Sequence, residues 1–424
     1  YISKVVEKYQ RAVVIPVELA KLIDRINASL QELEHSEATN PINTNILYTT
    51  LVVPMPYFRY WNNVSDAKEE YRESVKLTFS GQVVEIPPSE LLPSLKSWMH
   101  HNDLGKERAM AFGSQVDGRH NGIPPTYFSY EVTEWTLTGQ QSKDGKDYVN
   151  AARFILKRYP LFLEGPVRMM KSMNSTDVKE LYSQLTDSPL RDKGLGMFTV
   201  SASLDKESDG LGKIKTYTPG WFDNQSVWLD MSYKLYRQLL HHGLFSEFYK
   251  EFTSGAMLPF MNPEVYGRSI VESSSFLASS AFENPAVRGR GFLSRFSSAT
   301  SDFLDMWVLM MMGPRPFFLD ESGKLRMQLL PALPLWLFQG GGPSETPQVD
   351  KNASLQISFN LFAQTNVTYY NKRREDLIRI PPSRYEIGMR DGSVHRVMGP
   401  SIPTLLADKI RRVVFVNYID VFFD

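Results

Sequence analysis

Hydrophobic residues in the first quarter of the chain recur every three or four positions, the spacing of a buried helix face. This pattern predicts helix over residues 1–38, interrupted at Pro16, and over residues 91–110. A further helical run is expected at residues 44–53, ending before Pro54. The pattern therefore begins as that of a mainly helical protein.

Three shorter stretches depart from helical spacing. Alternation at residues 75–79, a Ser80-Gly81 pair and the run 83–86 predict a β-hairpin. Residues 126–135 are dense in aromatic rings and fit either a strand or a helix. The apolar run that starts at Leu161 is predicted to be closed by a Gly-Pro turn at residues 165–166.

Helical spacing returns between residues 223 and 312. Asp223 or Asn224 is expected to cap a helix that ends at Gly243, and a second helix is expected to start at Phe245. Ser297 or Ser298 is expected to cap an apolar helix that stops before Gly313-Pro314.

After Pro316 the pattern changes to period-two alternation with turn residues between the runs. Strands are predicted at residues 317–319, 324–329, 355–362, 367–370, 385–389, 394–397 and 413–423. The chain is therefore expected to be mainly α with a β-domain, divided into residues 1–316 and 317–424.

Composition narrows the classes of function. Among the 424 residues, 47 basic side chains balance 47 acidic ones, so no charge excess points to nucleic acid or an anionic membrane. The absence of cysteine excludes disulfides and thiolate chemistry, and the seven histidines lack metal-ligand spacing. The apolar stretch 303–312 is too short to span a bilayer. We expect no metal, no nucleic acid and no membrane.

Polar turns next to helix starts are the first candidate chemistry. The helix that begins near Ser298 follows Arg288, Arg290 and Arg295, and its first N–H groups could hold an oxyanion. An ordinary serine cap beside solvated arginines explains the same pattern.

Other candidates are ionic side chains. Arg268 could bind a phosphate while Glu264 orients a sugar hydroxyl, or the two could form a structural pair. Asp230 can pair with Lys234 one turn further along a helix, as an ordinary solvated face would.

A carboxylate pair for general acid–base chemistry cannot be selected from spacing. The carboxylates in the most aromatic or turn-rich settings are Glu131, Glu134 and Glu164. A glycoside hydrolase that uses two of them therefore stays an alternative.

Several segments, taken in order, resemble the inverting β-glucoside phosphorylases, meaning cellobiose phosphorylase and its relatives, including β-glucan phosphorylases. They are residues 214–226 (IKTYTPGWFDNQS), 262–269 (NPEVYGRS), 291–303 (GFLSRFSSATSDF), 330–336 (LPALPLW) and 367–371 (VTYYN). The resemblance spans roughly residues 120 to 371 and is most evident from residue 195 onward. It is specific as a set of motifs.

The resemblance implies an (α/α) six-hairpin toroid followed by a C-terminal β-sandwich. It implies cleavage of a β-glucosidic bond by inorganic phosphate, the co-substrate, to give α-glucose 1-phosphate. In that family an Asp protonates the leaving oxygen, and no metal or organic cofactor takes part.

The resemblance also implies a set of substrate- and phosphate-binding residues. Relatives place a polar phosphate ligand at the position of Arg268 and a Thr/Ser-Gly pair at Ser297-Ser298, while Glu264 and Tyr266 keep the character of their loop. Asn224 lies in the first of the matching segments and completes the set.

Two departures from the family pattern concern the same phosphate site. Asp230 stands where relatives carry a phosphate-contacting His, and an anion there would repel phosphate. Ser298 replaces the Gly whose bare backbone lets phosphate approach.

The segment bearing the general acid is not matched, so the chain is expected to be the C-terminal portion of such an enzyme, with the acid upstream of Tyr1. A non-catalytic carbohydrate-binding pseudoenzyme is the alternative that the departures favour. The expected ligands are a β-gluco-oligosaccharide and phosphate, a homodimer is compatible with the sequence, and a cytoplasmic home is expected because phosphorolysis uses intracellular phosphate.

Overall fold

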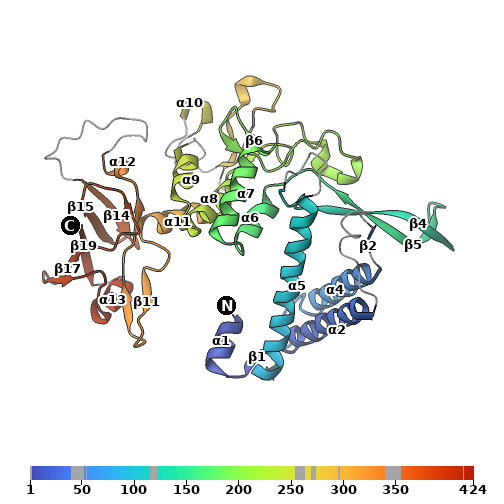
Figure 1. The fold of residues 1–424 in the computed structure, drawn as a ribbon, viewed down its shortest axis with the longest axis horizontal. Helices are drawn as coiled ribbons and strands as arrows, with labels where there is room; N and C mark the ends of the chain where they lie inside the picture. Colours follow the sequence, from blue (N-terminus) through green and yellow to red (C-terminus); the bar gives the residue numbers. More distant parts are fainter. Residues whose placement is uncertain are drawn as a thin grey trace. The chain divides into compact units, whose positions relative to one another are not determined.

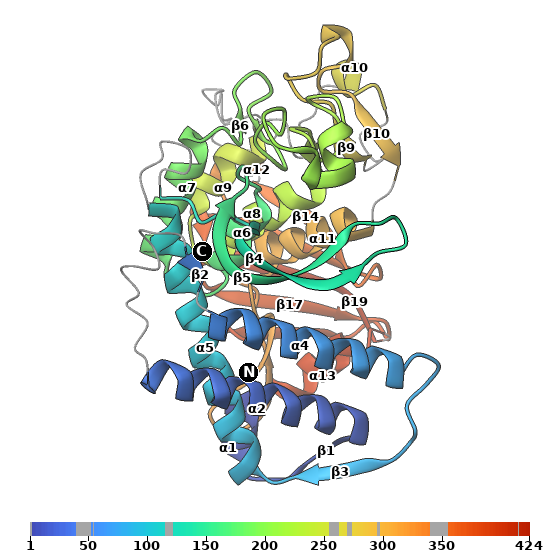
Figure 2. The same cartoon turned by 90° about the vertical axis from the view of Figure 1, so that its right-hand side faces the viewer.

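The computed structural model describes residues 2–39, 52–53, 55–114, 122–253, 263–268, 274–294, 297–339, 355–413 and 415–424 (Figure 1, Figure 2). They form two compact units. Unit 1 comprises residues 1–169 and 183–189, and unit 2 comprises residues 170–182 and 190–424. No helix within the described ranges is both long and apolar enough to cross a membrane.

Unit 1 is built on long helices. They are α1 (Ile2–Tyr9), α2 (Val17–Thr39), α4 (Met55–Ser74) and α5 (Pro88–Ser114). In both views α2 and α4 run side by side (Figure 1, Figure 2). Asn27 of α2 joins α5, because its amide accepts from the Trp98 indole at 2.8 Å and donates to the Ser94 hydroxyl at 2.9 Å. The predicted helices at 1–38 and 91–110 are confirmed, apart from a strand at the interruption.

The predicted hairpin at residues 75–86 is half wrong. β3 (Val83–Ile86) is a strand, but it pairs antiparallel with β1 (Val13–Pro16). Residues 76–82 form bends and irregular chain after α4, and Leu77 is 95% exposed, so this segment has no face to bury. The β-branched run that ends at Pro16 supplies the partner strand instead.

A long antiparallel ribbon follows, β4 (Phe128–Gln141) with β5 (Asp147–Arg158), and β2 (Val52–Val53) adds beside β5. The ambiguous stretch 126–135 is therefore strand. The predicted helix at 44–53 ends in that short strand, and its other residues lie outside the described ranges.

The expected Gly-Pro turn at residues 165–166 is wrong. Both residues lie in the first turn of α6 (Glu164–Met170), where proline costs little because its N–H would have no helical partner. The helix α7 (Ser175–Asp187) comes next, and its residues 175–182 belong to unit 2.

Unit 2 begins with helices and short strands. The helices are α8 (Leu229–His241), α9 (Phe245–Glu251), α10 (Pro263–Tyr266), α11 (Ser297–Met311) and the 3-10 segments η1 (Asp209–Thr216) and η4 (Pro285–Val287). The strands are β6 (Arg191–Asp192) with β7 (Met197–Phe198), and a sheet of β8 (Val227–Trp228), β9 (Ser274–Leu277) and β10 (Gly291–Ser294).

The predicted C-terminal end of α8 is confirmed, whereas its predicted N-terminal cap is not. Gly243 adopts φ +73° after the helix, and the N–H of Leu244 donates to the Leu239 carbonyl at 2.9 Å, as predicted for a glycine stop. The predicted start is wrong. The N-cap is Trp228, without a side-chain cap, because residues 221–224 form their own tight turn and the short strand β8 intervenes.

The C-terminal half of unit 2 holds a five-stranded sheet. Its order is β14 (Gln356–Leu361), β15 (Thr365–Asn371), β19 (Val416–Phe423), β17 (Arg384–Met389), β18 (Val394–Met398), with β15 and β19 parallel. Smaller elements accompany it: β11 (Phe317–Leu319), β12 (Leu325–Met327), β13 (Ala332–Leu333), α12 (Leu335–Phe338), β16 (Leu377–Ile378) and α13 (Thr404–Arg411). The predicted strands are thus confirmed, and the chain combines helices with a C-terminal multistranded sheet.

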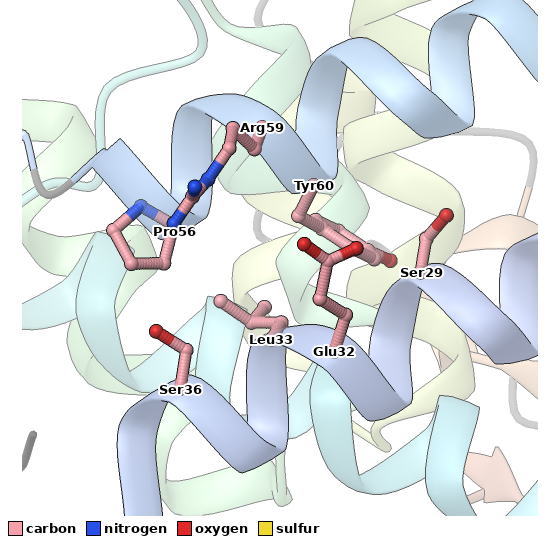
Figure 3. A pocket seen from close by; sticks show the side chains of 7 residues that line it. All are labelled: Ser29, Glu32, Leu33, Ser36, Pro56, Arg59 and Tyr60. Atoms are coloured by element: carbon pink, nitrogen blue, oxygen red, sulfur yellow. The ribbon is translucent and has the colours of Figure 1, made fainter. Parts of the chain in front are cut away.

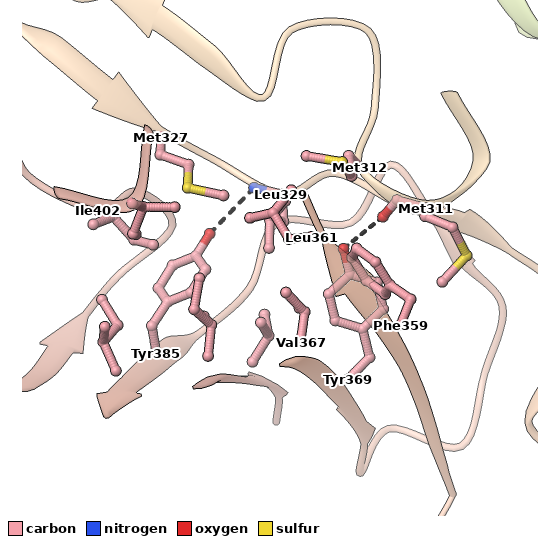
Figure 4. Packing of buried hydrophobic residues seen from close by; sticks show 14 of the residues in the cluster. Met311, Met312, Met327, Leu329, Phe359, Leu361, Val367, Tyr369, Tyr385 and Ile402 are labelled. Carbon is pink, nitrogen blue, oxygen red and sulfur yellow. Dashed lines mark hydrogen bonds between the residues drawn. The ribbon is translucent and has the colours of Figure 1, made fainter. Parts of the chain in front are cut away.

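One core joins this sheet to the end of α11 (Figure 4). The Tyr369 hydroxyl donates to the carbonyl of Met311 at 2.5 Å, and the Tyr385 hydroxyl accepts from the Leu329 N–H at 3.4 Å. The division predicted at residue 316 lies inside unit 2, between parts of the chain that share this core.

Candidate functional site

Two matched rows of polar side chains line the contact between α8 and α11. On α8 they are Asp230, Lys234 and Arg237, and on α11 they are Ser298, Asp302 and Asp305. Each row follows the spacing i, i+4, i+7, which keeps its members on one face of a helix. We call these six residues the α8–α11 polar seam.

The charges of the seam alternate across the two helices. Lys234 Nζ lies 2.8 Å from Asp230 and 3.7 Å from Asp302. The Arg237 guanidinium lies 2.6 Å from Asp302 and 3.3 Å from Asp305. The predicted Asp230–Lys234 pair is therefore present, but Asp230 is only 7% exposed, so it does not belong to a solvated helix face.

Burial and charge compete at the centre of the seam. Burial raises the pKa of Asp302 above its usual value, while Lys234 and Arg237 act in the opposite direction. Nε of Arg237 is buried and has no hydrogen-bond partner among the described residues. A buried donor of this kind is normally satisfied by a water or by a ligand acceptor.

Ser298 closes the seam at the N-terminal end of α11. Its hydroxyl donates to Asp230 at 3.3 Å. Ser297 and Ser298 are the first two residues of the 15-residue helix, where backbone N–H groups lack helical partners and the helix dipole favours an anion. The side chain of Ser297 lies outside the described part of the structure.

The short helix α10, which contains Glu264 and Tyr266, and Arg268 after it adjoin this region. Nε of Arg268 donates to the carbonyl of Gly291 in β10, the strand that precedes α11, at 2.7 Å. Tyr266 is buried and lies near Tyr233 of α8, whose pKa is raised mainly by burial and also by this neighbour. Glu264 is exposed.

The Asn224 side chain forms structural hydrogen bonds with neighbouring segments. It is fully buried, accepts from the Leu204 N–H at 3.2 Å, and donates to the Tyr217 carbonyl at 2.8 Å and to Asp205 at 3.3 Å. Among the predicted binding residues the structure thus joins Asp230 directly to Ser298, while the bonds of Asn224 connect its turn to residues 204–205.

The carboxylates considered for a hydrolase belong to unit 1. Glu131 and Glu134 are exposed on β4, and Glu134 pairs with Arg153 at 2.9 Å. Glu164 pairs with Arg168 at 2.6 Å and accepts from the Tyr127 hydroxyl at 3.3 Å.

Unit 1 also contains a pocket between α2 and α4 that holds none of the predicted residues (Figure 3). It is lined by Ser29, Glu32, Leu33, Ser36, Pro56, Arg59 and Tyr60. The first four residues follow one face of α2, and the last three follow one face of α4.

Sequence reasoning missed a buried ion pair in unit 2. The Glu251 carboxylate is fully buried, accepts from the Tyr182 hydroxyl at 2.6 Å and pairs with Arg191 at 2.7 Å. No sequence spacing could have revealed it, because the three residues come from α7, β6 and α9. The α8–α11 polar seam was easier to predict, since its i, i+4, i+7 rows are visible in the sequence.

Within the described residues no group of three or more His, Asp or Glu side chains is arranged to hold a metal ion. Searches among protein-family models and among curated proteins found no match to this chain.

Proposed function

We propose that the chain is a carbohydrate-active protein whose unit 2 carries the phosphate side of a β-gluco-oligosaccharide phosphorylase. The observation that carries the proposal is the N-terminal end of α11. There, the backbone N–H groups of the first turn of α11 lie next to a seam containing Lys234 and Arg237, and Nε of Arg237 is buried without a hydrogen-bond partner among the described residues. As part of this proposal, the helices form part of an (α/α) toroid and the C-terminal strands form a β-sandwich, as the resemblance implies.

The proposed reaction uses phosphate as the nucleophile. A phosphate oxygen forms a bond to the anomeric carbon while the bond from that carbon to the leaving oxygen breaks. The leaving oxygen takes a proton from a carboxylic acid, and the configuration is inverted. Lys234, Arg237 and the first N–H groups of α11 would hold the phosphate charge.

Asp230 supports a second candidate, a carbohydrate-binding protein without phosphorolysis. Its carboxylate accepts from Ser298 and holds Lys234, so two groups that could serve phosphate are already engaged. Three carboxylates against two cations leave the seam net negative, which opposes a phosphate dianion.

The deciding assay uses the full-length gene product with short β-glucans. Phosphorus NMR should show glucose 1-phosphate that forms only when inorganic phosphate is present. Arg237→Lys should lower the rate at least about tenfold, because a donor fork aimed at an anion is lost. Phosphate-independent hydrolysis, or no turnover, counts against the proposal.

The double variant Asp230→His, Ser298→Gly separates the two candidates. A rise in phosphate affinity, measured by calorimetry, favours a phosphorylase whose site is blocked. Unchanged phosphate affinity together with retained oligosaccharide binding favours the non-catalytic candidate.

A further inference from the structure

The five-stranded sheet of unit 2 has one face on the core and a second, outward face. Along β19 the inward residues Val416, Ile419, Val421 and Phe423 are buried, whereas Tyr418, Asp420 and Phe422 are partly exposed. Strand register places Gly388 opposite Tyr418 and Glu386 opposite Asp420 on the neighbouring strand β17. These four residues share the outward face, because side chains alternate along strands.

The Tyr418 ring lies over the Gly388 backbone. A Cβ at Gly388 would come within 2.0 Å of the ring. The Tyr418 ring can therefore occupy this position only because residue 388 has no side chain. A ring that lies across the neighbouring strand turns its other flat side away from the sheet. This gives the outward face a flat apolar platform at a fixed position.

Two carboxylates flank the platform. Tyr370 lies beside Asp420 and acts to lower the pKa of that carboxyl, and Glu386 pairs with Arg384 at 2.8 Å and with Arg396 at 3.4 Å. Burial and the neighbouring Glu386 raise the pKa of Asp420. Because Glu386 and Asp420 lie opposite each other on neighbouring strands, both carboxylates can accept hydrogen bonds from the hydroxyls of one ligand.

The Arg384 side chain is held against β19. Its guanidinium lies 3.6 Å from the centre of the Phe422 ring, and the Phe422 and Tyr370 rings stack at 4.8 Å. The groups around the platform are therefore fixed before any ligand arrives, which lowers the entropic cost of binding.

We propose that Tyr418, Asp420 and Glu386 form a pyranose-binding subsite, separate from the α8–α11 polar seam. The apolar face of a sugar ring would lie on Tyr418, and its hydroxyls would donate to the two carboxylates. The patch is neutral, which suits an uncharged ligand rather than phosphate, nucleic acid or a basic peptide. Its three acidic side chains are balanced by three basic ones: Glu386, Asp420 and Asp424 against Arg384, Arg396 and Lys372. That the pyranose is β-linked glucose rests on the proposed function.

The test is a titration of the purified chain with cellotetraose and laminaritetraose, without phosphate, followed by calorimetry and saturation-transfer NMR. We expect binding of at least one of them. Tyr418→Ala should weaken it at least about tenfold, and Tyr418→Phe should change it less than about threefold. Gly388→Ala should also weaken it, because the new methyl group displaces the ring. Asp420→Asn should weaken it through the loss of a charged acceptor.

Phe415→Ala is the matched control, since Phe415 is an exposed aromatic residue directly before β19. It should bind as the wild type does, and circular dichroism should show each variant folded. No binding by the wild-type chain, or equal binding by Tyr418→Ala and Asp420→Asn, overturns the inference. Binding lost only in Arg237→Lys would overturn the inference while leaving the proposed function intact. Binding that depends on Tyr418, without phosphorolysis, would support the inference and contradict the proposed function.

Discussion

At the scale of single residues, buried hydroxyls of unit 2 are tied to main-chain groups. Tyr369 and Tyr385 are fully buried, and each hydroxyl donates to a carbonyl, Tyr369 to Met311 at 2.5 Å and Tyr385 to Pro400 at 2.8 Å. Burial raises the pKa of both tyrosines, because a phenolate would lose its hydration there. These side chains therefore serve as neutral donors at all physiological pH values.

Replacing Tyr369 by Phe should lower the free energy of unfolding by about 1–2 kcal/mol, because the Met311 carbonyl loses its donor in a dry core. Urea unfolding of the variant measures the loss. Tyr148→Phe is the control, since Tyr148 is 53% exposed and should change stability by less than about 0.5 kcal/mol. Equal effects of the two substitutions would contradict this prediction.

Asp420 gives a prediction with a defined pH dependence. Its pKa is raised by burial and by Glu386, so ionisation destabilises the fold. This penalty is complete above the folded-state pKa and disappears below the unfolded-state value of about 3.9. Asp420→Asn should therefore raise Tm at pH 7 by about 1–2 °C.

Thermal melts of wild type and Asp420→Asn between pH 4 and 8 check the sign. The gain in Tm should shrink as the pH falls, because the wild-type carboxyl then becomes protonated. A gain that stays constant or grows towards pH 4 would refute the assignment.

Local sequence rules predicted some residue contacts and missed others for identifiable reasons. The Asp230–Lys234 pair follows from helical spacing and is present. Its burial could not be foreseen, because it depends on α11, which starts more than sixty residues later. Asn224 was expected to cap a helix, but its bonds to Leu204, Asp205 and Tyr217 depend on a turn that local rules do not encode.

At the scale of elements, one buried carboxylate holds three segments of unit 2 together. Glu251 of α9 accepts from Tyr182 of α7 and pairs with Arg191 of β6, whose guanidinium also lies 4.5 Å from the centre of the Phe198 ring. Removing one partner of such a pair leaves the other charge buried without compensation.

Glu251→Gln should therefore lower the free energy of unfolding by about 3–5 kcal/mol. Glu247→Gln on the same helix is the matched control. Its partner Lys179 is largely exposed, so the expected cost is below about 1 kcal/mol. Chemical denaturation followed by tryptophan fluorescence compares the two, and a loss of similar size in both would contradict the prediction.

Element prediction succeeded where pattern and termination signals agreed. The strands β14, β15, β17, β18 and β19 alternate and are separated by turn residues, such as Asp391-Gly392. It failed at residues 75–79, where alternation without a partner or a buried face did not produce a strand. Pairing is a long-range property, and β3 found its partner seventy residues earlier in β1.

At the scale of the whole molecule, charge balance governs behaviour in solution. The formal net charge is zero at pH 7 and the isoelectric point is near 7.2. Solubility in polyethylene glycol should therefore be lowest near pH 7 and rise towards pH 5.5 and pH 9, as self-repulsion grows. Precipitation midpoints across this range test the prediction. A minimum well away from pH 7 would show that local patches, rather than net charge, control association.

The strand order of the large sheet has a consequence for how the protein is made. β19 occupies the central position, between β15 and β17, although it is the latest of the five strands in the chain. While a ribosome is still translating residues 416–423, the hairpins β14–β15 and β17–β18 each have one edge without its sheet partner. During synthesis these two edges must therefore stay apart until β19 has left the ribosome and can pair with both of them.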